Sequence, residues 1–198
     1  MIKSFKISVP QHTLNNIYSK VKNYPWNLIQ NVNGWEYGTN YNYLRNISKY
    51  WSSKYNWKKY EKKINSFPNY ITKVNGSNIH FIKEKSKNPK SRPLLLLHGW
   101  PGSVVEFLDI IPKLAHPEKF GGKKDDGFDV IVPSLPGFGF STPINKAKGP
   151  REIGKILNKL MVKNLGYKNY AVQGGDWGAT IAGWIGYDSS KNCKAIHI

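Results

Sequence analysis

Apolar positions recur at helical spacing through the first third of the chain. Leu14, Ile17 and Val21 lie three or four residues apart, and a second apolar series with similar spacing runs over residues 44–64. Such spacing places apolar side chains on one face of a helix, so we expect two amphipathic helices. The stretch 24–38 between them is rich in aromatic residues and punctuated by Gly and Asn. We expect it to be an ordered loop held by buried rings.

The pattern changes after residue 68, where helical spacing gives way to short apolar runs. Residues 70–74 and 79–83 flank Asn75-Gly76-Ser77-Asn78, which predicts a hairpin of two short strands around a turn. From residue 93 onward, short apolar runs alternate with helical stretches, as is typical of a parallel sheet with crossover helices. The predicted strands cover 94–97, 130–132, 170–173 and 195–198, and the predicted helices cover 104–114, 151–165 and 179–187. We therefore expect an α/β domain over 70–198, preceded by a helical, aromatic-rich segment over 1–69.

The composition indicates a folded chain with an excess of Lys. The 198 residues are 39% hydrophobic and 14% aromatic, far beyond what a disordered segment carries. The formal charge is +18, and the first 92 residues hold 17 of the 30 cationic side chains against three acidic ones. Only three of the cations are Arg, whereas base readout and bidentate phosphate contacts favour Arg. We interpret the charge as a solvated Lys-rich surface and expect no nucleic-acid partner; peripheral attachment of the basic N-terminal half to an anionic membrane is the alternative.

The sequence also limits the covalent and membrane chemistry of the chain. The single cysteine, Cys193, cannot form an internal disulfide, and the paired Cys and His clusters typical of metal sites do not occur. Neither a run of about 20 apolar residues nor a secretory signal is present. We expect a soluble, intracellular chain that does not rely on oxidation.

The segment Gly174-Gly-Asp-Trp-Gly178 lies between a predicted strand and a predicted helix. It has the small-x-nucleophile-x-small pattern of a nucleophile elbow, with Asp176 in the central position. In such a turn the main chains pass so close that a Cβ at 174 or 178 would clash, and the N-terminus of the next helix keeps a central carboxylate ionised. Asp176 is therefore a candidate nucleophile. The alternative is that Asp176 only caps the following helix.

A second motif, His98-Gly-Trp-Pro-Gly-Ser103, directly follows the strand predicted at 94–97. In hydrolases with such an elbow, the loop after this strand and the residue after the nucleophile each offer a backbone N–H to a developing oxyanion. These two donors would be Trp100 and Trp177. We interpret His98 as a structural residue that braces the loop, in preference to a catalytic one. A third segment, 133–143, suits an ordered loop at the same face of the sheet.

Two other enzyme classes are disfavoured. No G-x-S-x-G occurs, which argues against a serine esterase or lipase. Gly137 and Gly139 are followed by Thr142 where a dinucleotide-binding motif has its third glycine, and no Walker A run exists.

Taken together, these motifs resemble the microsomal and juvenile-hormone epoxide hydrolases of the α/β-hydrolase superfamily. The likeness extends from about residue 5 to residue 198 and includes the aromatic N-terminal segment. The matching pieces occur in family order and are Tyr37-Gly-Thr-Asn40, Tyr43-Leu44, Tyr50-Trp51, Tyr55-Asn-Trp57, Asn65-Ser-Phe-Pro68, Ile79-His-Phe-Ile82, His98-Gly-Trp-Pro-Gly-Ser103, Pro133-Ser-Leu-Pro-Gly-Phe-Gly-Phe-Ser141 and Gln173-Gly-Gly-Asp-Trp-Gly178.

The resemblance implies an α/β-hydrolase fold and an enzyme that adds water to an epoxide, giving a diol through an Asp-ester intermediate. The implied substrate is a small apolar epoxide: juvenile hormone, a lipid epoxide or a xenobiotic arene oxide in a detoxification reaction. No metal and no cofactor are implied.

The resemblance also assigns roles residue by residue. Asp176 is the nucleophile, and Trp100 and Trp177 supply the oxyanion-hole amides. His80 matches a structural position and carries no chemistry. Support of the elbow and of the loop is assigned to Gly174, Gly175, Gly178, His98, Gly99 and Pro101.

The sequence departs from the family beyond the elbow. The family continues through further strands beyond the one predicted at 195–198, a helical cap, an acid and a general-base histidine, and we expect none of these parts here. The histidines are His12, His80, His98, His116 and His197, and none follows the elbow at a distance that would place it on a later strand-end loop. We interpret the chain as the first part of such an enzyme, with strands 1 to 6 of the core, and expect it to be inactive alone. By family it would locate to the endoplasmic reticulum or microsomal membrane, whereas the chain as written would be cytosolic or peripheral. The alternatives are a haloalkane-dehalogenase-like hydrolase and a non-catalytic remnant that binds apolar ligands.

Overall fold

The computed structural model describes residues 1–29, 34–144 and 146–198, and these form two compact units. The larger unit comprises Met1–Lys6 and Ile64–Ile198, and the smaller comprises Ile7–Lys63. The sequence predicted a boundary at residue 69 instead. Residues 1–6 belong to the larger unit because they form β1 (Lys3–Ser4), which pairs antiparallel with β2 (Asn69–Val74) and so is part of the sheet.

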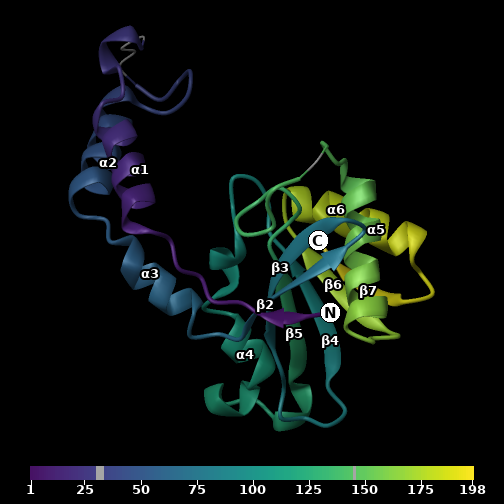
Figure 1. Cartoon of the computed structure of the whole chain (residues 1–198). Coiled ribbons are helices and arrows are strands. Elements are labelled where there is room, and N and C mark those ends of the chain that lie inside the picture. Colours follow the sequence, from purple (N-terminus) through teal and green to yellow (C-terminus); the bar gives the residue numbers. More distant parts are fainter. Residues whose placement is uncertain (30–33, 145) are drawn as a thin grey trace. The chain divides into compact units, whose positions relative to one another are not determined.

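A seven-stranded sheet is the centre of the larger unit, with the strand order β1-β2-β3-β5-β4-β6-β7 (Figure 1). The remaining strands are β3 (Ser77–Glu84), β4 (Arg92–Leu97), β5 (Phe128–Pro133), β6 (Tyr170–Gly174) and β7 (Cys193–His197). The strands β1, β2, β3 and β5 pair antiparallel, whereas β5, β4, β6 and β7 pair parallel. The hairpin and the four later strands predicted from the sequence are confirmed, with no bound shifted by more than two residues.

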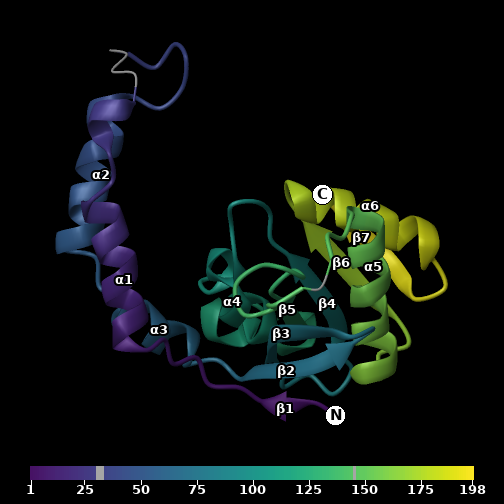
Figure 2. The same cartoon turned by 45° about the horizontal axis from the view of Figure 1, so that its top comes forward.

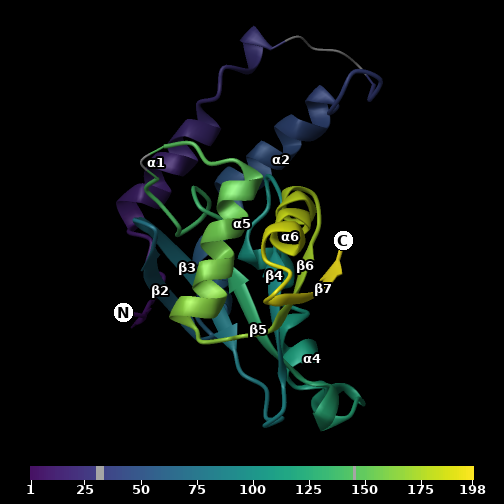
Figure 3. The same ribbon diagram turned by 90° about the vertical axis from the view of Figure 1, so that its right-hand side faces the viewer.

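Helices cover both faces of the parallel strands. α5 (Pro150–Lys159) and α6 (Trp177–Asp188) lie on one side of the sheet, and α4 (Ile111–Ala115) lies on the other (Figure 2). Figure 3 looks onto α5 and α6, which pack against each other. Because both faces are covered, β4 reads as a continuous apolar run, and its leucines at 95, 96 and 97 are no more than 2% exposed.

Two of the predicted helices are interrupted. The predicted helix 104–114 is a 3₁₀ turn, Val104–Phe107, followed by α4, because Pro112 is excluded from a helix interior and lies in the first turn of α4. The predicted helix 151–165 ends as α5 at Lys159 and continues as a π-helical turn, Leu160–Asn164. The third, 179–187, is confirmed as α6, which begins two residues earlier.

The core of the larger unit lies between the sheet and the pair α5 and α6. α5 contributes Ile153, Ile156 and Leu157, whose i, i+3, i+4 spacing places them on one face of the helix. Gly154 lies between them, and a Cβ added there would be 3.2 Å from the Cγ1 atom of Ile185 in α6. The missing side chain lets the two helices approach closely, and this packing holds α6 against the sheet.

Among its described residues, the smaller unit contains three α-helices and a 3₁₀ turn, Trp26–Leu28. The α-helices are α1 (Gln11–Lys22), α2 (Tyr41–Ser53) and α3 (Trp57–Ile64), whose last residue belongs to the larger unit. The second helix predicted from the sequence, 44–64, is therefore two helices separated at residues 54–56. Among the described residues, no helix is both long enough and apolar enough to cross a membrane.

The rings of the stretch 24–38 are not buried, so that prediction was wrong. Tyr24, Trp35 and Tyr37 are 48%, 60% and 85% exposed; the predicted loop also includes residues 30–33, which lie outside the described ranges. Of all residues in α1 and α2, only Leu14 is buried. A pair of helices with so little interior leaves most of these rings exposed, and Trp26, which packs against Tyr24 and Tyr41, is only half-buried.

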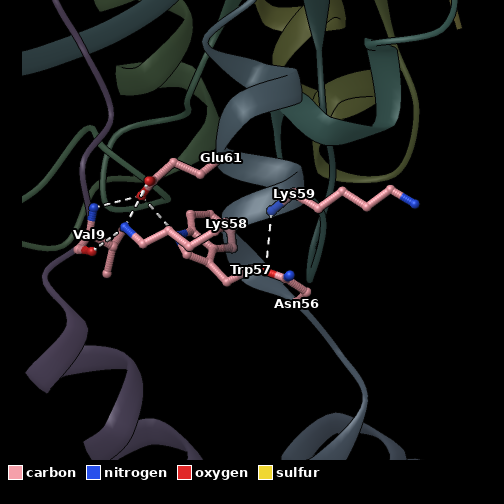
Figure 4. Close-up of polar contacts among 6 residues, drawn as sticks. All are labelled: Val9, Asn56, Trp57, Lys58, Lys59 and Glu61. Atoms are coloured by element: carbon pink, nitrogen blue, oxygen red, sulfur yellow. Dashed lines mark hydrogen bonds and ion pairs between the residues drawn. The ribbon is translucent and has the colours of Figure 1, made fainter.

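A buried carboxylate fastens the start of the smaller unit to α3 (Figure 4). Glu61 is 9% exposed and accepts hydrogen bonds from the backbone N–H of Val9 and the indole N–H of Trp57, at 2.7 and 3.0 Å. Lys58 pairs with the same carboxylate at 2.8 Å and donates to the carbonyl oxygen of Val9. Burial raises the pKa of Glu61, but the hydrogen bonds from Lys58, Val9 and Trp57 outweigh burial and lower it. Both polar backbone groups of Val9 are thereby satisfied by one helix.

A buried polar cluster joins β3 to the loop that follows β5. The ring of His80 is 0% exposed, with Nδ1 2.9 Å from the Ser134 hydroxyl and Nε2 2.9 Å from the Asn69 side-chain oxygen. Because that amide oxygen can only accept, Nε2 carries the proton and Nδ1 accepts from Ser134. The Ser141 hydroxyl accepts from the backbone N–H of His80 and donates to the carbonyl oxygen of Ser134. The cluster therefore gives both ring nitrogens of a neutral imidazole a hydrogen-bond partner.

We predict that acid destabilises the larger unit through His80. Burial lowers the pKa of His80 from 6.5 to about 4, so between these values the unfolded chain binds a proton that the folded chain does not. The stabilisation from neutral His80 is complete above pH 6.5 and is lost as the pH falls toward 4. The slope reaches up to about 1.4 kcal/mol per pH unit. Urea unfolding between pH 7 and pH 4.5, followed by circular dichroism, measures it.

The variant His80→Gln is the control, because glutamine forms hydrogen bonds but does not titrate. We expect this variant to be less stable at pH 7, with a free energy of unfolding that depends less on pH than that of the wild type. The other histidines are common to both proteins and cancel in the comparison. Equal slopes in the two proteins would contradict the role given to His80.

Candidate active site

Asp176 occupies the turn between β6 and α6, where its backbone has φ 52° and ψ −124°. Residues with a side chain rarely adopt this positive φ, so the surrounding structure must enforce it. The turn places Asp176 at the carboxyl end of β6 and at the N-cap of α6, where its side chain accepts from the Trp177 N–H. The sequence left two alternatives open for Asp176, a nucleophile presented by an elbow and a cap of the following helix. The position of Asp176 is compatible with both roles at once.

Two glycines make room for this turn. A Cβ at Gly174 would overlap the carbonyl group of Gly178, and a Cβ at Gly178 would overlap the carbonyl oxygen of Leu97 at the end of β4. The steric clash expected at 174 and 178 is thus with backbone atoms, which cannot rotate away. Gly175 differs, because no atom lies within 4 Å of a Cβ built there and its φ is not positive. The structure gives Gly175 no steric reason to be glycine.

Two backbone N–H groups from different segments hold one oxygen of Asp176. The amides of Trp100 and Trp177 donate to Oδ1 at 2.8 and 2.6 Å. Within the described residues no hydrogen bond reaches Oδ2, and the side chain is exposed. The Trp100 amide, followed by the Trp177 amide, lowers the pKa of Asp176 against the opposing effect of desolvation. Asp176 is therefore an ionised carboxylate with one oxygen held and the other open.

The loop after β4 is anchored on both sides of Trp100. His98 is 1% exposed, and its ring lies 3.0 Å from the carbonyl oxygen of Gly99 and 3.0 Å from the backbone nitrogen of Leu135. On the other side, the Glu106 carboxylate accepts from the Ser103 N–H at 3.2 Å, and the Ser103 hydroxyl caps the following 3₁₀ turn. The loop is thus held by side chains where no strand or helix holds it.

Gly99 and Pro101 lie on either side of Trp100, between these anchors. A Cβ at Gly99 would be 2.6 Å from the Cβ of Asp176, so glycine lets the loop approach the carboxylate. Pro101 is exposed and is joined to Trp100 by a cis peptide bond.

The sequence did not identify all of the residues that shape this loop. The capping pair at 103 and 106 has the readable spacing S-x-x-E. The contact of Leu135 with His98 joins residues that are distant in the chain, and no local signal in the sequence marks it.

No histidine in the described residues forms a hydrogen bond with Asp176. The ring nitrogens of His98 and His80 already have partners, and His116 pairs with Glu84 at 2.8 Å. The described residues also contain no group of three or more His, Cys, Asp or Glu side chains placed to hold a metal ion. The described part of the site consequently holds a carboxylate and two amide donors without an adjacent base.

Two family models match the chain. A model of the epoxide hydrolase N-terminus matches residues 2–107, and a model of the α/β-hydrolase fold matches residues 92–198. The chain belongs to the epoxide hydrolase family. The α/β-hydrolase fold expected from the sequence is confirmed, and the family also accounts for the helical segment that precedes the sheet.

Epoxide hydrolases similar to this chain align along its whole length. Epoxide hydrolase 1 of Oryctolagus cuniculus is 36% identical over 205 residues, covering 100% of this chain and 44% of the relative. The juvenile hormone epoxide hydrolase of the silkworm Bombyx mori matches with a TM-score of 0.84 at 36% identity, covering 100% of this chain and 47% of that one. The Aspergillus niger epoxide hydrolase matches with a TM-score of 0.81 at 30% identity, covering 100% and 51%. The chain spans about half the length of these relatives.

We predict that Gly174→Ala and Gly178→Ala each destabilise the chain, whereas Gly175→Ala does not. The first two force a methyl group into backbone atoms, and overpacking of this kind costs about 1–3 kcal/mol or more. Gly175→Ala meets open space and should change the free energy of unfolding by less than about 0.5 kcal/mol. Thermal unfolding of the three variants measures the difference. Equal losses at all three positions, or a harmless Gly178→Ala, would contradict the close packing of the turn.

Proposed function

We propose that Asp176 opens epoxides by nucleophilic attack, as the first half of an epoxide hydrolase reaction. The observation that supports this is the different environment of the two carboxylate oxygens: Oδ1 accepts hydrogen bonds from two backbone amides, and Oδ2 is open. A carboxylate that is ionised and oriented is a competent nucleophile. Membership of the epoxide hydrolase family supports the same reaction.

The proposed reaction has two steps. First, Oδ2 forms a bond to an epoxide carbon, the ring C–O bond breaks, and the released alkoxide takes a proton from solvent, which leaves a hydroxyalkyl ester of Asp176. Second, a water that has given its proton to a base adds to Cγ of the ester. The Cγ–Oδ2 bond of this adduct then breaks, Oδ2 leaves with the product, which takes the proton back from the base to become the diol, and the water oxygen completes the restored carboxylate. Negative charge develops on Oδ1 during the second step, where the Trp100 and Trp177 amides already point.

A small apolar epoxide is the proposed substrate class. Trp100 and Trp177 are 67% and 42% exposed. The two residues whose backbone amides hold the carboxylate therefore also provide apolar side-chain surface. Candidate members of the class are the juvenile hormone for which the silkworm relative is named, lipid epoxides and xenobiotic arene oxides. The proposed chemistry uses no cofactor.

Haloalkane dehalogenation would use the same Asp-centred turn, and passive binding of apolar ligands would not need it. The match of residues 2–107 to an epoxide hydrolase model favours the epoxide, because this match includes the helices that precede the sheet. The strained φ of Asp176 and its two amide donors favour a reactive carboxylate over passive binding.

We predict that the 198-residue chain forms a covalent adduct with styrene oxide but does not turn over. Attack by Oδ2 needs only the carboxylate and its amide donors, whereas ester hydrolysis needs a general base, whose help is worth about two to four orders of magnitude. Intact-mass spectrometry should therefore show one added styrene oxide per chain. Diol measured by chromatography should not exceed one equivalent.

Two variants identify the carboxylate responsible. Asp176→Asn keeps the size of the side chain but removes the nucleophile, so no adduct should form. Asp188→Asn is the matched control, because Asp188 is a carboxylate at the opposite end of α6, held by a two-point contact with Arg151 at 2.7 and 2.8 Å. It should react like the wild type. An adduct on Asp176→Asn would refute the assignment of Asp176 as the nucleophile. Repeated turnover by the pure chain would refute the inference that it has no general base for ester hydrolysis.

The smaller unit is proposed to attach to anionic membrane surfaces, which would suit the microsomal location implied by the family. Residues 7–63 hold nine Lys and Arg against two Glu. α2 buries no residue and exposes an apolar stripe at helical spacing. The stripe consists of Tyr43, Leu44, Ile47, Tyr50 and Trp51, each 41–52% exposed. Aromatic and apolar side chains accompanied by cations are typical of helices that lie in a membrane interface.

We predict that the chain sediments with vesicles containing phosphatidylserine, more weakly at high salt, and not with pure phosphatidylcholine vesicles. Ile47→Asp should reduce this binding by about tenfold, since it removes one apolar contact of the stripe. Asn42→Asp adds the same charge to α2 outside the stripe and should have a smaller effect. Equal losses in the two variants would mean that charge alone drives binding, and the stripe would then have no part in it.

A further inference from the structure

The Trp100 amide that holds Asp176 shares a rigid peptide plane with the Gly99 carbonyl. These two groups belong to one planar unit, and the bond between Gly99 and Trp100 is trans, so they point in opposite directions. The Gly99 oxygen lies 3.0 Å from Nδ1 of His98, and the Trp100 nitrogen lies 2.8 Å from Oδ1 of Asp176. One plane therefore connects the His98 ring to the carboxylate.

The tautomer of His98 follows from its partners. Nε2 lies 3.0 Å from the backbone nitrogen of Leu135, which can only donate, so Nε2 carries no proton. The proton of the neutral ring is then on Nδ1 and is donated to the Gly99 carbonyl oxygen. Phe138 packs edge-on against the ring with centroids 5.4 Å apart, and the ring is 1% exposed. His98 cannot rotate without breaking both hydrogen bonds.

The two amides at Asp176 differ in what directs them. Trp177 is the first residue of α6, so the helix aligns its N–H. Trp100 lies in the loop and is 67% exposed, and no helix or strand directs its N–H. The capping pair of Ser103 and Glu106 holds the loop beyond Pro101, but it forms no hydrogen bond with the peptide group between Gly99 and Trp100. Of the hydrogen bonds in the described residues, the one from His98 is the bond that reaches this plane from the protein core.

We propose that His98 is a positioning residue, which aims the Trp100 amide at Oδ1 of Asp176 through the hydrogen bond from its Nδ1–H to the Gly99 carbonyl. The effect on the reaction rests on the proposed function, because it matters only if Asp176 is the nucleophile. The geometry itself requires no reaction and is tested without one.

Three variants separate positioning from simple loss of stability. His98→Asn carries an amide nitrogen as many bonds from the backbone as Nδ1, so it keeps a donor for Gly99 and loses the acceptor for Leu135. His98→Gln carries an amide oxygen near the place of Nε2, so it keeps the acceptor and loses the donor. His98→Phe loses both. Each change disturbs a buried side chain, and all three should lower the thermal midpoint.

Nuclear magnetic resonance of the isotope-labelled chain reads the Trp100 amide and the Asp176 carboxyl directly. In the wild type we expect a downfield Trp100 amide proton and a carboxyl carbon that titrates below its usual range, because the Trp100 amide is the main cause of the lowered pKa of Asp176. In His98→Gln and His98→Phe the amide proton should move upfield and the pKa of Asp176 should rise toward its usual value. In His98→Asn both should stay close to the wild type.

Rescue by Asn but not by Gln would support the proposal. Equal changes in these two variants, or an unchanged Trp100 amide in His98→Phe, would overturn it. Long-range proton–nitrogen spectra of the wild type provide a test that does not depend on any variant folding, since a proton found on Nε2 of His98 would also overturn it. Absence of a styrene oxide adduct would count against the proposed function alone and would not alter these shifts.

Discussion

The convergence of two backbone N–H groups on one oxygen of Asp176 sets the geometric demands on the larger unit. One donor follows β4 and the other follows β6, so these strands must lie side by side in a fixed register. They pair parallel with Leu97 opposite Gly174, which brings their carboxyl ends to the same edge of the sheet. Gly178 then packs against the Leu97 carbonyl. The charge state of the carboxylate therefore depends on strand register, through contacts that only a missing Cβ permits.

Hydrogen bonds among buried polar groups connect the core of the sheet to the loop that follows β4. His80 bonds to Ser134, and the next residue, Leu135, donates to His98, whose ring reaches the Gly99 carbonyl. Each ring is neutral in the tautomer that its partners require. The sheet alone does not determine the direction of the Trp100 amide, because the loop has no ladder of its own. The site is thus built from strand pairing on one side and from histidine contacts on the other.

Much of this fold is readable from the sequence, for physical reasons that also explain the failures. Parallel strands covered on both faces are continuous apolar runs, and the glycines around Asp176 mark a turn with no room for side chains. A two-residue strand such as β1 has no periodicity to detect. The helical spacing continues across residues 54–56, so the break between α2 and α3 is invisible. The sequence does not show whether an aromatic residue is buried or exposed. The exposure of these rings follows from the small interior of the smaller unit, which is visible only in the structure.

The same limits apply to the site. Asp176, Trp100 and Trp177 belong to local motifs and are found from the sequence, and their meeting follows from the order of the strands. The contact between Leu135 and His98 depends on two loops whose approach no short pattern encodes. A histidine beside glycine can be assigned to structure, but the peptide plane on which it acts is visible only in three dimensions.

The central place of β4 also has a kinetic consequence for biosynthesis. Both neighbours of β4 come later in the chain, since Leu94 pairs with Val130 of β5 and with Ala171 of β6. Pairings so distant in sequence form slowly. At 5–20 residues per second, a ribosome takes roughly 4–15 s to travel from the end of β4 to the end of β6. During that interval a strand of four consecutive leucines has at least one edge open. Of the three strands β4, β5 and β6, the last to be synthesised is β6, whose pairing with β4 creates the carboxylate site.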